Sequence, residues 1–116
     1  MQYALLIYAS EPSAPQEPTP ADMAPWQALS EAMEQAGVVR GGSQLEPSAQ
    51  ARSLRLRDGQ VMTTDGPFAE TTEQLGGFYL VECDSIDEAL EWAARIPVAT
   101  SGTIEVRPIV PEGDPS

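Results

Sequence analysis

The stretch that most constrains this chain is residues 65–80, where a tight turn leads through a polar segment into an apolar strand. Asp65-Gly66-Pro67 predicts the turn, because glycine adopts positive φ and proline fixes φ at about −65°. The polar segment carries Glu70 and Glu73. Gly76-Gly77 then opens the strand, and the missing Cβ atoms allow another backbone or a ligand to approach closely. Such an arrangement occurs in binding sites, but residue types alone favour an ordinary loop.

Six segments predict strands from their apolar or alternating patterns: 3–8, 38–45, 53–57, 60–63, 77–83 and 103–107. The segment 38–45 is expected to be broken by Gly41-Gly42. Asp58-Gly59 joins the two alternating runs on either side of it, and this dipeptide predicts a tight hairpin.

Two further segments predict helices. The first is expected to begin at Thr19-Pro20 and to end at Gly37. Because Pro25 lies near its start, the helix could instead begin only at Pro25. Ser85 and the glutamate three residues later form a capping box, and this second helix must end before the proline at position 97. The side chains expected to be buried are Trp26, Leu29, Met33 and Ala36 in the first helix and Ile86, Ala89, Leu90 and Ala93 in the second.

The order of these elements predicts an α+β fold of the ferredoxin-like βαββαβ type with an inserted β-hairpin. One domain is expected over residues 1–110, followed by a loose acidic tail over 111–116. Two helices cover only one face of such a sheet, so the other apolar face needs a partner. We therefore expect a homodimer that buries at least ~1,200 Å² between two sheets.

The charge balance argues against several kinds of partner. The chain has 18 acidic residues, six arginines, no lysine and no histidine, and its net charge is −12. Such a chain repels the phosphates of nucleic acids and anionic membrane surfaces, so direct binding to either is not expected. No segment approaches the ~20 apolar residues of a membrane span, and no basic leader precedes the first strand. A cytoplasmic protein is predicted.

Motifs that depend on histidine or on paired cysteines are absent from the sequence. Without histidine there is no Ser-His-Asp or Cys-His arrangement and no imidazole base. The single cysteine, Cys83, is expected to be a buried small hydrophobe. Glycine-rich nucleotide loops are also missing, so neither a metal nor a cofactor is predicted. The residues leave one alternative open, a Mg²⁺ or Ca²⁺ site made from the carboxylates of Asp65, Glu70 and Glu73.

Five charged residues are candidates for ligand binding: Arg57, Asp65, Glu73, Glu105 and Arg107. Because side chains alternate along a strand, Glu105 and Arg107 would share the face opposite Ile104 and Val106. If those two pack under the helices, Arg107 lies in the cleft between two sheets and would bind an anionic group bidentately. Asp65, at the mouth of the cleft, is the candidate catalytic base. The structural alternative is a simple ion pair between these charges.

The run over residues 65–78 resembles the signature of the YCII-related DGPF family, Asp-Gly-Pro-Phe-Ala-Glu-Thr-Lys-Glu-Gln-Leu-Gly-Gly-Phe. Thr72 stands where the family has lysine, and residues 99–102 occupy the stretch where relatives often place histidine. The resemblance implies a ferredoxin-like fold with two sheets packed face to face as a dimeric α/β barrel. It also implies a hydrolase- or isomerase-like His–Asp site, of which this chain offers only the acidic half, Asp65.

Two functions fit these observations. The first is a ligand-binding or regulatory module for an unknown small molecule. Members of the DGPF group often sit beside genes for extracytoplasmic-function sigma factors, so the resemblance implies a link to sigma-factor systems. The alternative is a small enzyme that uses carboxylate acid–base chemistry in the dimer cleft. The missing histidine favours the module, whereas the intact Asp65-Gly66-Pro67-Phe68 turn keeps the enzyme open.

Overall fold

The computed structural model describes residues 1–12 and 17–111 of the chain. The strands of the main sheet are β1 (Gln2–Ser10), β2 (Val39–Gln44), β5 (Glu73–Glu82) and β6 (Thr103–Pro108). A separate hairpin consists of β3 (Arg52–Arg57) and β4 (Gln60–Asp65). The helices are α1 (Pro20–Ala36) and α2 (Ile86–Ala93), with short 3₁₀ turns η1 (Ser48–Gln50) and η2 (Pro97–Thr100). The predicted tail lies outside the described residues from position 112 onward.

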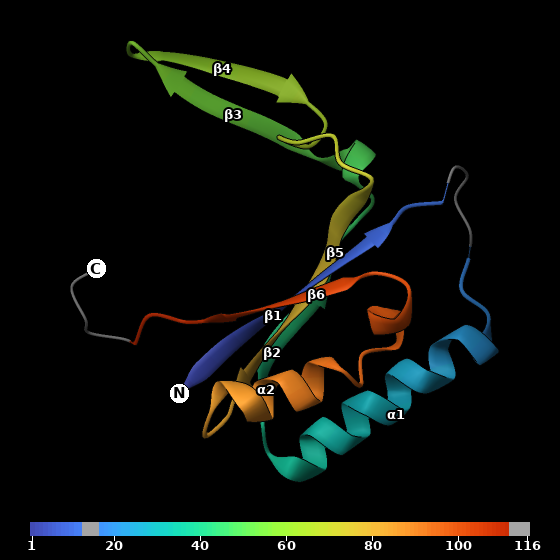
Figure 1. The fold of residues 1–116 in the computed structure, drawn as a ribbon. Coiled ribbons are helices and arrows are strands. Elements are labelled where there is room, and N and C mark those ends of the chain that lie inside the picture. Colours follow the sequence, from blue (N-terminus) through green and yellow to red (C-terminus); the bar gives the residue numbers. More distant parts are fainter. Residues whose placement is uncertain (13–16, 112–116) are drawn as a thin grey trace.

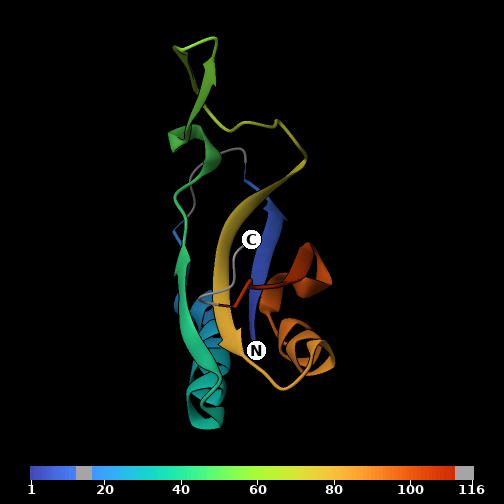
Figure 2. The same ribbon diagram turned by 90° about the vertical axis from the view of Figure 1, so that its left-hand side faces the viewer.

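The main sheet is antiparallel and has the strand order β2-β5-β1-β6. This is the order of a ferredoxin-like fold, with the β3–β4 hairpin inserted between its second and third strands, so the predicted fold class is confirmed. Both helices lie on one side of the sheet (Figure 1). Figure 2 shows the sheet from the other side, which the helices leave open. We call this side the open face.

The hydrophobic core lies between the sheet and the helices. Tyr3, Leu5 and Ile7 alternate along β1 and are buried, and Leu29 and Met33 of α1 pack against them. This alternation follows the two-residue period of a strand, so it also fixes which side chains of β1 face the other way. The remaining members of the core are Val38, Val81, Cys83, Ala89, Ala93 and Ile96.

Helix α1 begins at Pro20, the earlier of the two predicted starts. The backbone N–H of Asp22 donates to Thr19 Oγ1 at 3.2 Å, and the Thr19 N–H donates to Asp22 Oδ2 at 2.9 Å. This reciprocal cap satisfies backbone groups that the first turn leaves free, and α1 continues through Pro25. Gly37 ends the helix with φ of 70°, as predicted. Leu29 and Met33 are buried, Trp26 is half-buried and Ala36 is exposed.

Helix α2 has the predicted cap, since the Glu88 N–H donates to Ser85 Oγ at 3.2 Å. Of the four side chains predicted to be buried in α2, two are buried and two are exposed. Ala89 and Ala93 are buried, whereas Ile86 is 42% exposed and Leu90 is 48% exposed. The small alanine side chains allow this eight-residue helix to lie close to β1 and β6, and the larger side chains then fall outside the contact.

Strand β2 is not broken at its glycines but carries a bulge, where the register with β5 shifts between Val39 and Gly41. Gly42 has φ of 150°, and a Cβ there would lie 2.6 Å from the carbonyl oxygen of Phe78. A Cβ on Gly77 would lie 2.9 Å from the carbonyl oxygen of Ser43. The close approach predicted for Gly76-Gly77 therefore occurs at Gly77, to the neighbouring β2 backbone, whereas a Cβ on Gly76 would lie an ordinary 3.9 Å from the carbonyl oxygen of Ile7.

The β3–β4 hairpin is confirmed. Asp58 has φ of 52° and Gly59 has φ of 76°, the two positive values that a tight hairpin turn requires. The hairpin leaves the end of the main sheet and extends toward the side of the open face (Figures 1 and 2). Every residue of β4 is exposed.

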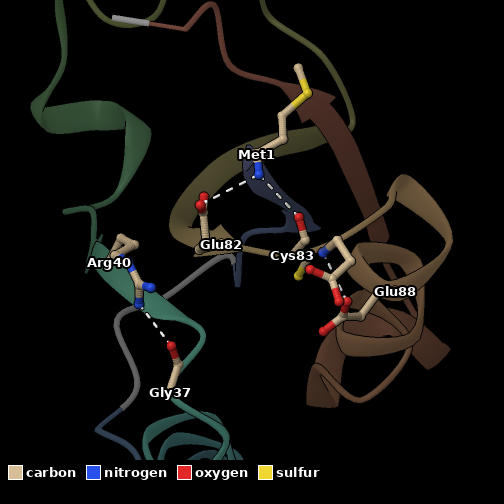
Figure 3. A network of polar contacts seen from close by, with 7 residues as sticks. Met1, Gly37, Arg40, Glu82, Cys83 and Glu88 are labelled. Carbon is tan, nitrogen blue, oxygen red and sulfur yellow. Dashed lines mark hydrogen bonds and ion pairs between the residues drawn. The ribbon is translucent and has the colours of Figure 1, made fainter.

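The strand ends near the N-terminus are tied together by polar contacts, shown in Figure 3. The amino group of Met1 lies 3.4 Å from Glu82 Oε1 and donates to the Cys83 carbonyl oxygen at 3.2 Å. Cys83 itself is buried, as predicted. Burial, with the carboxylate of Glu88 nearby, raises the pKa of the Cys83 thiol, so little of it is the thiolate that a nucleophile needs. No helix among the described residues is long and apolar enough to span a bilayer.

Candidate functional site

A row of polar side chains follows the β6 edge of the open face. Glu105 and Arg107 lie opposite Leu6 and Ala4 of β1, on the face away from the core. Arg107 Nε donates to Glu105 Oε2 at 3.0 Å along the same strand. At the end of the row, Thr103 Oγ1 donates to Glu73 Oε1 at 2.8 Å. We call Glu73, Thr103, Glu105 and Arg107 the polar row.

Beside the polar row, the centre of the open face is apolar. The strand register sets Leu6 against Phe78 and Tyr8 against Leu75. Leu6, Tyr8 and Phe78 are half-buried, and Leu75 is 37% exposed. These side chains stand on the opposite side of the sheet from the core cluster, so they form a second apolar surface.

The other two predicted ligand residues lie elsewhere. Arg57 ends β3 and Asp65 ends β4, so both belong to the hairpin, which is a separate sheet. Asp65 Oδ1 accepts from Arg52 Nε at 3.1 Å, and both side chains are more than four-fifths exposed. Within one chain, the structure therefore brings Glu73, Glu105 and Arg107 onto one face and leaves Asp65 and Arg57 apart from them.

Asp65→Asn should change the melting temperature by only a few degrees, at most about 4 °C. An exposed ion pair such as Arg52–Asp65 contributes about 0–1 kcal/mol, and the amide retains an oxygen acceptor of nearly the same shape. Thermal melts of the two proteins followed by circular dichroism would measure the difference. A fall of 10 °C or more would show that Asp65 supports the fold in a way that its exposed ion pair does not explain.

The loop after Asp65 is ordered by contacts along the chain. The guanidinium of Arg55 lies 4.6 Å from the centroid of the Phe68 ring. Gln74 Nε2 donates to the carbonyl oxygens of Ala69 at 3.1 Å and Thr71 at 3.0 Å. Thr72, which stands in place of the family's lysine, is exposed. Among residues 1–12 and 17–111, no three acidic or cysteine side chains gather closely enough to hold a metal ion.

A cavity of about 520 Å³ lies on the helix side of the sheet. Met23 and Trp26 of α1 form one wall, and Ile7, Gly77 and Tyr79 belong to the strands that line it. Sequence reasoning missed this site. The sequence predicted Trp26 only as a buried side chain of α1, and Tyr79 only as part of an apolar strand. Their incomplete burial could not be read from periodicity.

The cavity is lined mostly by uncharged side chains, and Asp22 is the one charged residue among the described residues that line it. Burial raises the pKa of the Tyr79 phenol, against an opposing hydrogen bond with Ser30, so the phenol stays protonated near neutrality. The carboxylate of Asp22, which also lines the cavity, is already bound to Thr19 in the helix cap. The rest of the lining is mostly apolar, with Ser43 and Gln44 as its uncharged polar side chains. Together with Trp26 and Tyr79, such a lining suits an uncharged, largely apolar molecule.

The sequence of the chain is similar to a known family. Residues 1–112 match the model of the YCII-related domain. The chain is also similar to an uncharacterised protein of Rhizobium meliloti (strain 1021), with 46% identity over 77 residues. That match covers 65% of this chain and 62% of the relative, so it spans about three-fifths of the relative's length. The chain belongs to the family of YCII-related domains.

Proposed function

We propose that this protein is a homodimeric small-molecule-binding module whose ligand lies in the cavity beneath α1. The observation that carries the proposal is the cavity itself. Its volume of about 520 Å³ is within the ~300–1,000 Å³ range of ligand pockets, and its wall offers Trp26 and Tyr79. A molecule that fits these walls is uncharged and mostly apolar, with one group able to hydrogen-bond the Tyr79 phenol.

The dimeric part of the proposal rests on the open face. A monomer that left Leu6, Phe78 and Leu75 against water would expose a contiguous apolar patch, and such patches usually mark interaction sites. Packing two open faces together buries them and forms the barrel that the family resemblance implies. The polar row then lies at the rim of the interface, where Glu73, Glu105 and Arg107 are proposed to meet solvent or a polar end of a ligand.

The geometry favours a binding module over an enzyme. General acid–base catalysis needs a carboxylate free to exchange a proton with a substrate. Glu105 is instead engaged by Arg107, Glu73 by Thr103 and Asp65 by Arg52. A binding module also fits the regulatory role beside sigma factors that the resemblance implies.

The cavity is tested with N-phenyl-1-naphthylamine, a neutral probe that fluoresces in apolar sites. We expect saturable, micromolar binding to the wild type and at least a tenfold weaker affinity for Ala9→Phe. Ala9 lines the cavity, so the added ring fills part of it. The matched control is Ala94→Phe, which adds the same ring at the exposed C-terminal cap of α2.

The result that would contradict the proposed site is equal probe affinity in wild type and Ala9→Phe, with Ala9→Phe folded by circular dichroism. In that case the probe binds elsewhere, and the open face is the next place to look. A loss of binding in both variants would show that added rings disturb the protein generally, and would also count against the cavity.

A further inference from the structure

The β3–β4 hairpin presents an apolar side to solvent. Leu54, Leu56 and Val61 share one side of it, because Leu56 lies opposite Val61 in the strand register and Leu54 lies two residues earlier. Their exposed fractions are 63%, 58% and 62%. Three large aliphatic side chains exposed to this degree on one two-stranded ribbon form a surface that needs a partner. We call these three residues the apolar side of the hairpin.

The direction of the hairpin points to where that partner lies. The hairpin forms its own sheet and projects beyond the main one, toward the side of the open face (Figures 1 and 2). A two-stranded ribbon is at best marginally stable on its own in water, so packing against another surface would stabilise it. The hairpin and a partner docked on the open face would therefore lie on the same side of the main sheet.

The charge of the hairpin narrows the choice of partner. It carries Arg52, Arg55 and Arg57, three of the six arginines of the chain, against only Asp58 and Asp65. The hairpin is thus slightly positive within a chain of net charge −12, so the rest of the chain is strongly negative. A second copy of this chain offers an acidic body to a basic hairpin, which is the charge complementarity expected of an interface.

We propose that the hairpin is an arm that reaches across the dimer and packs its apolar side on the body of the partner. This inference rests on the face-to-face dimer of the proposed function and extends that interface beyond the sheets. By two-fold symmetry each chain gives one arm and receives one. The arm carries Arg57, near its tip, toward the partner, whereas Asp65 pairs with Arg52 at the base of the arm.

The first test compares dimer affinity in two variants by analytical ultracentrifugation. Replacing the apolar side with serine, L54S/L56S/V61S, should raise the dimer dissociation constant at least tenfold. The matched control is Met62→Ser. Met62 is 57% exposed, much like Leu56, but it lies on the opposite side of the hairpin because it pairs with Arg55. Its dissociation constant should stay within twofold of the wild type.

A second measurement uses the wild type alone, so it does not depend on how the variants fold. Trypsin cleaves after arginine, and this chain has no lysine. Cleavage after Arg52, Arg55 and Arg57 should slow at least tenfold between protein concentrations at which the monomer and then the dimer predominate. Cleavage after Arg95, which lies beyond the end of α2 on the helix side, is the internal reference and should not slow.

The outcomes separate the two proposals. Weakened dimerisation of the triple variant together with concentration-dependent protection of the arm supports the inference. A dimeric wild type in which the triple variant dimerises normally, or the arm is cleaved equally at all concentrations, overturns the arm and leaves the face-to-face dimer standing. A wild type that stays monomeric at every concentration overturns both the arm and the dimer, and leaves the cavity to be judged by its own probe.

Discussion

Leu6→Asp should be a monomer of about 12.4 kDa under conditions in which the proposed dimer of the wild type forms. Leu6 lies in the apolar centre of the open face, with Phe78 of β5 on one side and Glu105 of β6 on the other. A carboxylate there has another carboxylate as its neighbour, and Arg107 is already engaged with Glu105. Burying such an unpaired charge at an interface costs several kcal/mol. Since each ~1.4 kcal/mol is tenfold in affinity, we expect dimerisation at least 100-fold weaker.

Light scattering at matched concentrations would measure this change, with circular dichroism to confirm that Leu6→Asp is folded. The control is Leu90→Asp. Leu90 is 48% exposed on α2, on the helix side of the sheet, so its replacement by the same residue should leave the dimer intact. A folded Leu6→Asp protein that remains dimeric would show that the two chains associate through another surface.

The elements of the fold could be predicted because their signals are local. Asp58-Gly59 can adopt the two positive φ values of a hairpin turn wherever the hairpin lies, and Thr19 with Asp22 caps a helix using only its own residues. The buried stripe of α2 could not be predicted correctly, because burial depends on how closely a helix approaches the sheet. That distance is set here by Ala89 and Ala93, and it leaves Leu90 in solvent.

The placement of some candidate site residues could be predicted, because strand alternation is also a local signal. Strand alternation alone places Glu105 and Arg107 together on one face, and the structure has them there. Asp65 was expected near them, at the mouth of the same cleft. It lies instead on the hairpin, since β4 pairs with β3 and not with the main sheet. The cavity beneath α1 was missed altogether. It is bounded by segments as distant as Met23 and Val98, and such a void depends on tertiary packing.

Substitutions at two neighbouring residues of β1 can distinguish the roles of the two faces of the sheet. Leu5 is fully buried in the core, while Leu6, the next residue, faces the open side. Leu5→Ala should cost about 2–5 kcal/mol, because it removes buried methyl groups and leaves a cavity that the core cannot fully close. For a chain of 116 residues, a loss of 1 kcal/mol lowers the melting temperature by about 4 °C, so we expect a fall of about 8–20 °C.

That fall should be the same at every protein concentration, since Leu5 acts within one chain. Leu6→Ala makes the same chemical change on the face proposed to bind the partner. Because association with a partner stabilises the folded state by mass action, its effect on the melting temperature should grow with protein concentration. Melts of wild type, Leu5→Ala and Leu6→Ala at 1 μM and at 100 μM would measure the difference. A concentration-dependent loss in Leu5→Ala, or a concentration-independent loss of equal size in Leu6→Ala, would mean that the two faces of β1 do not divide core from interface.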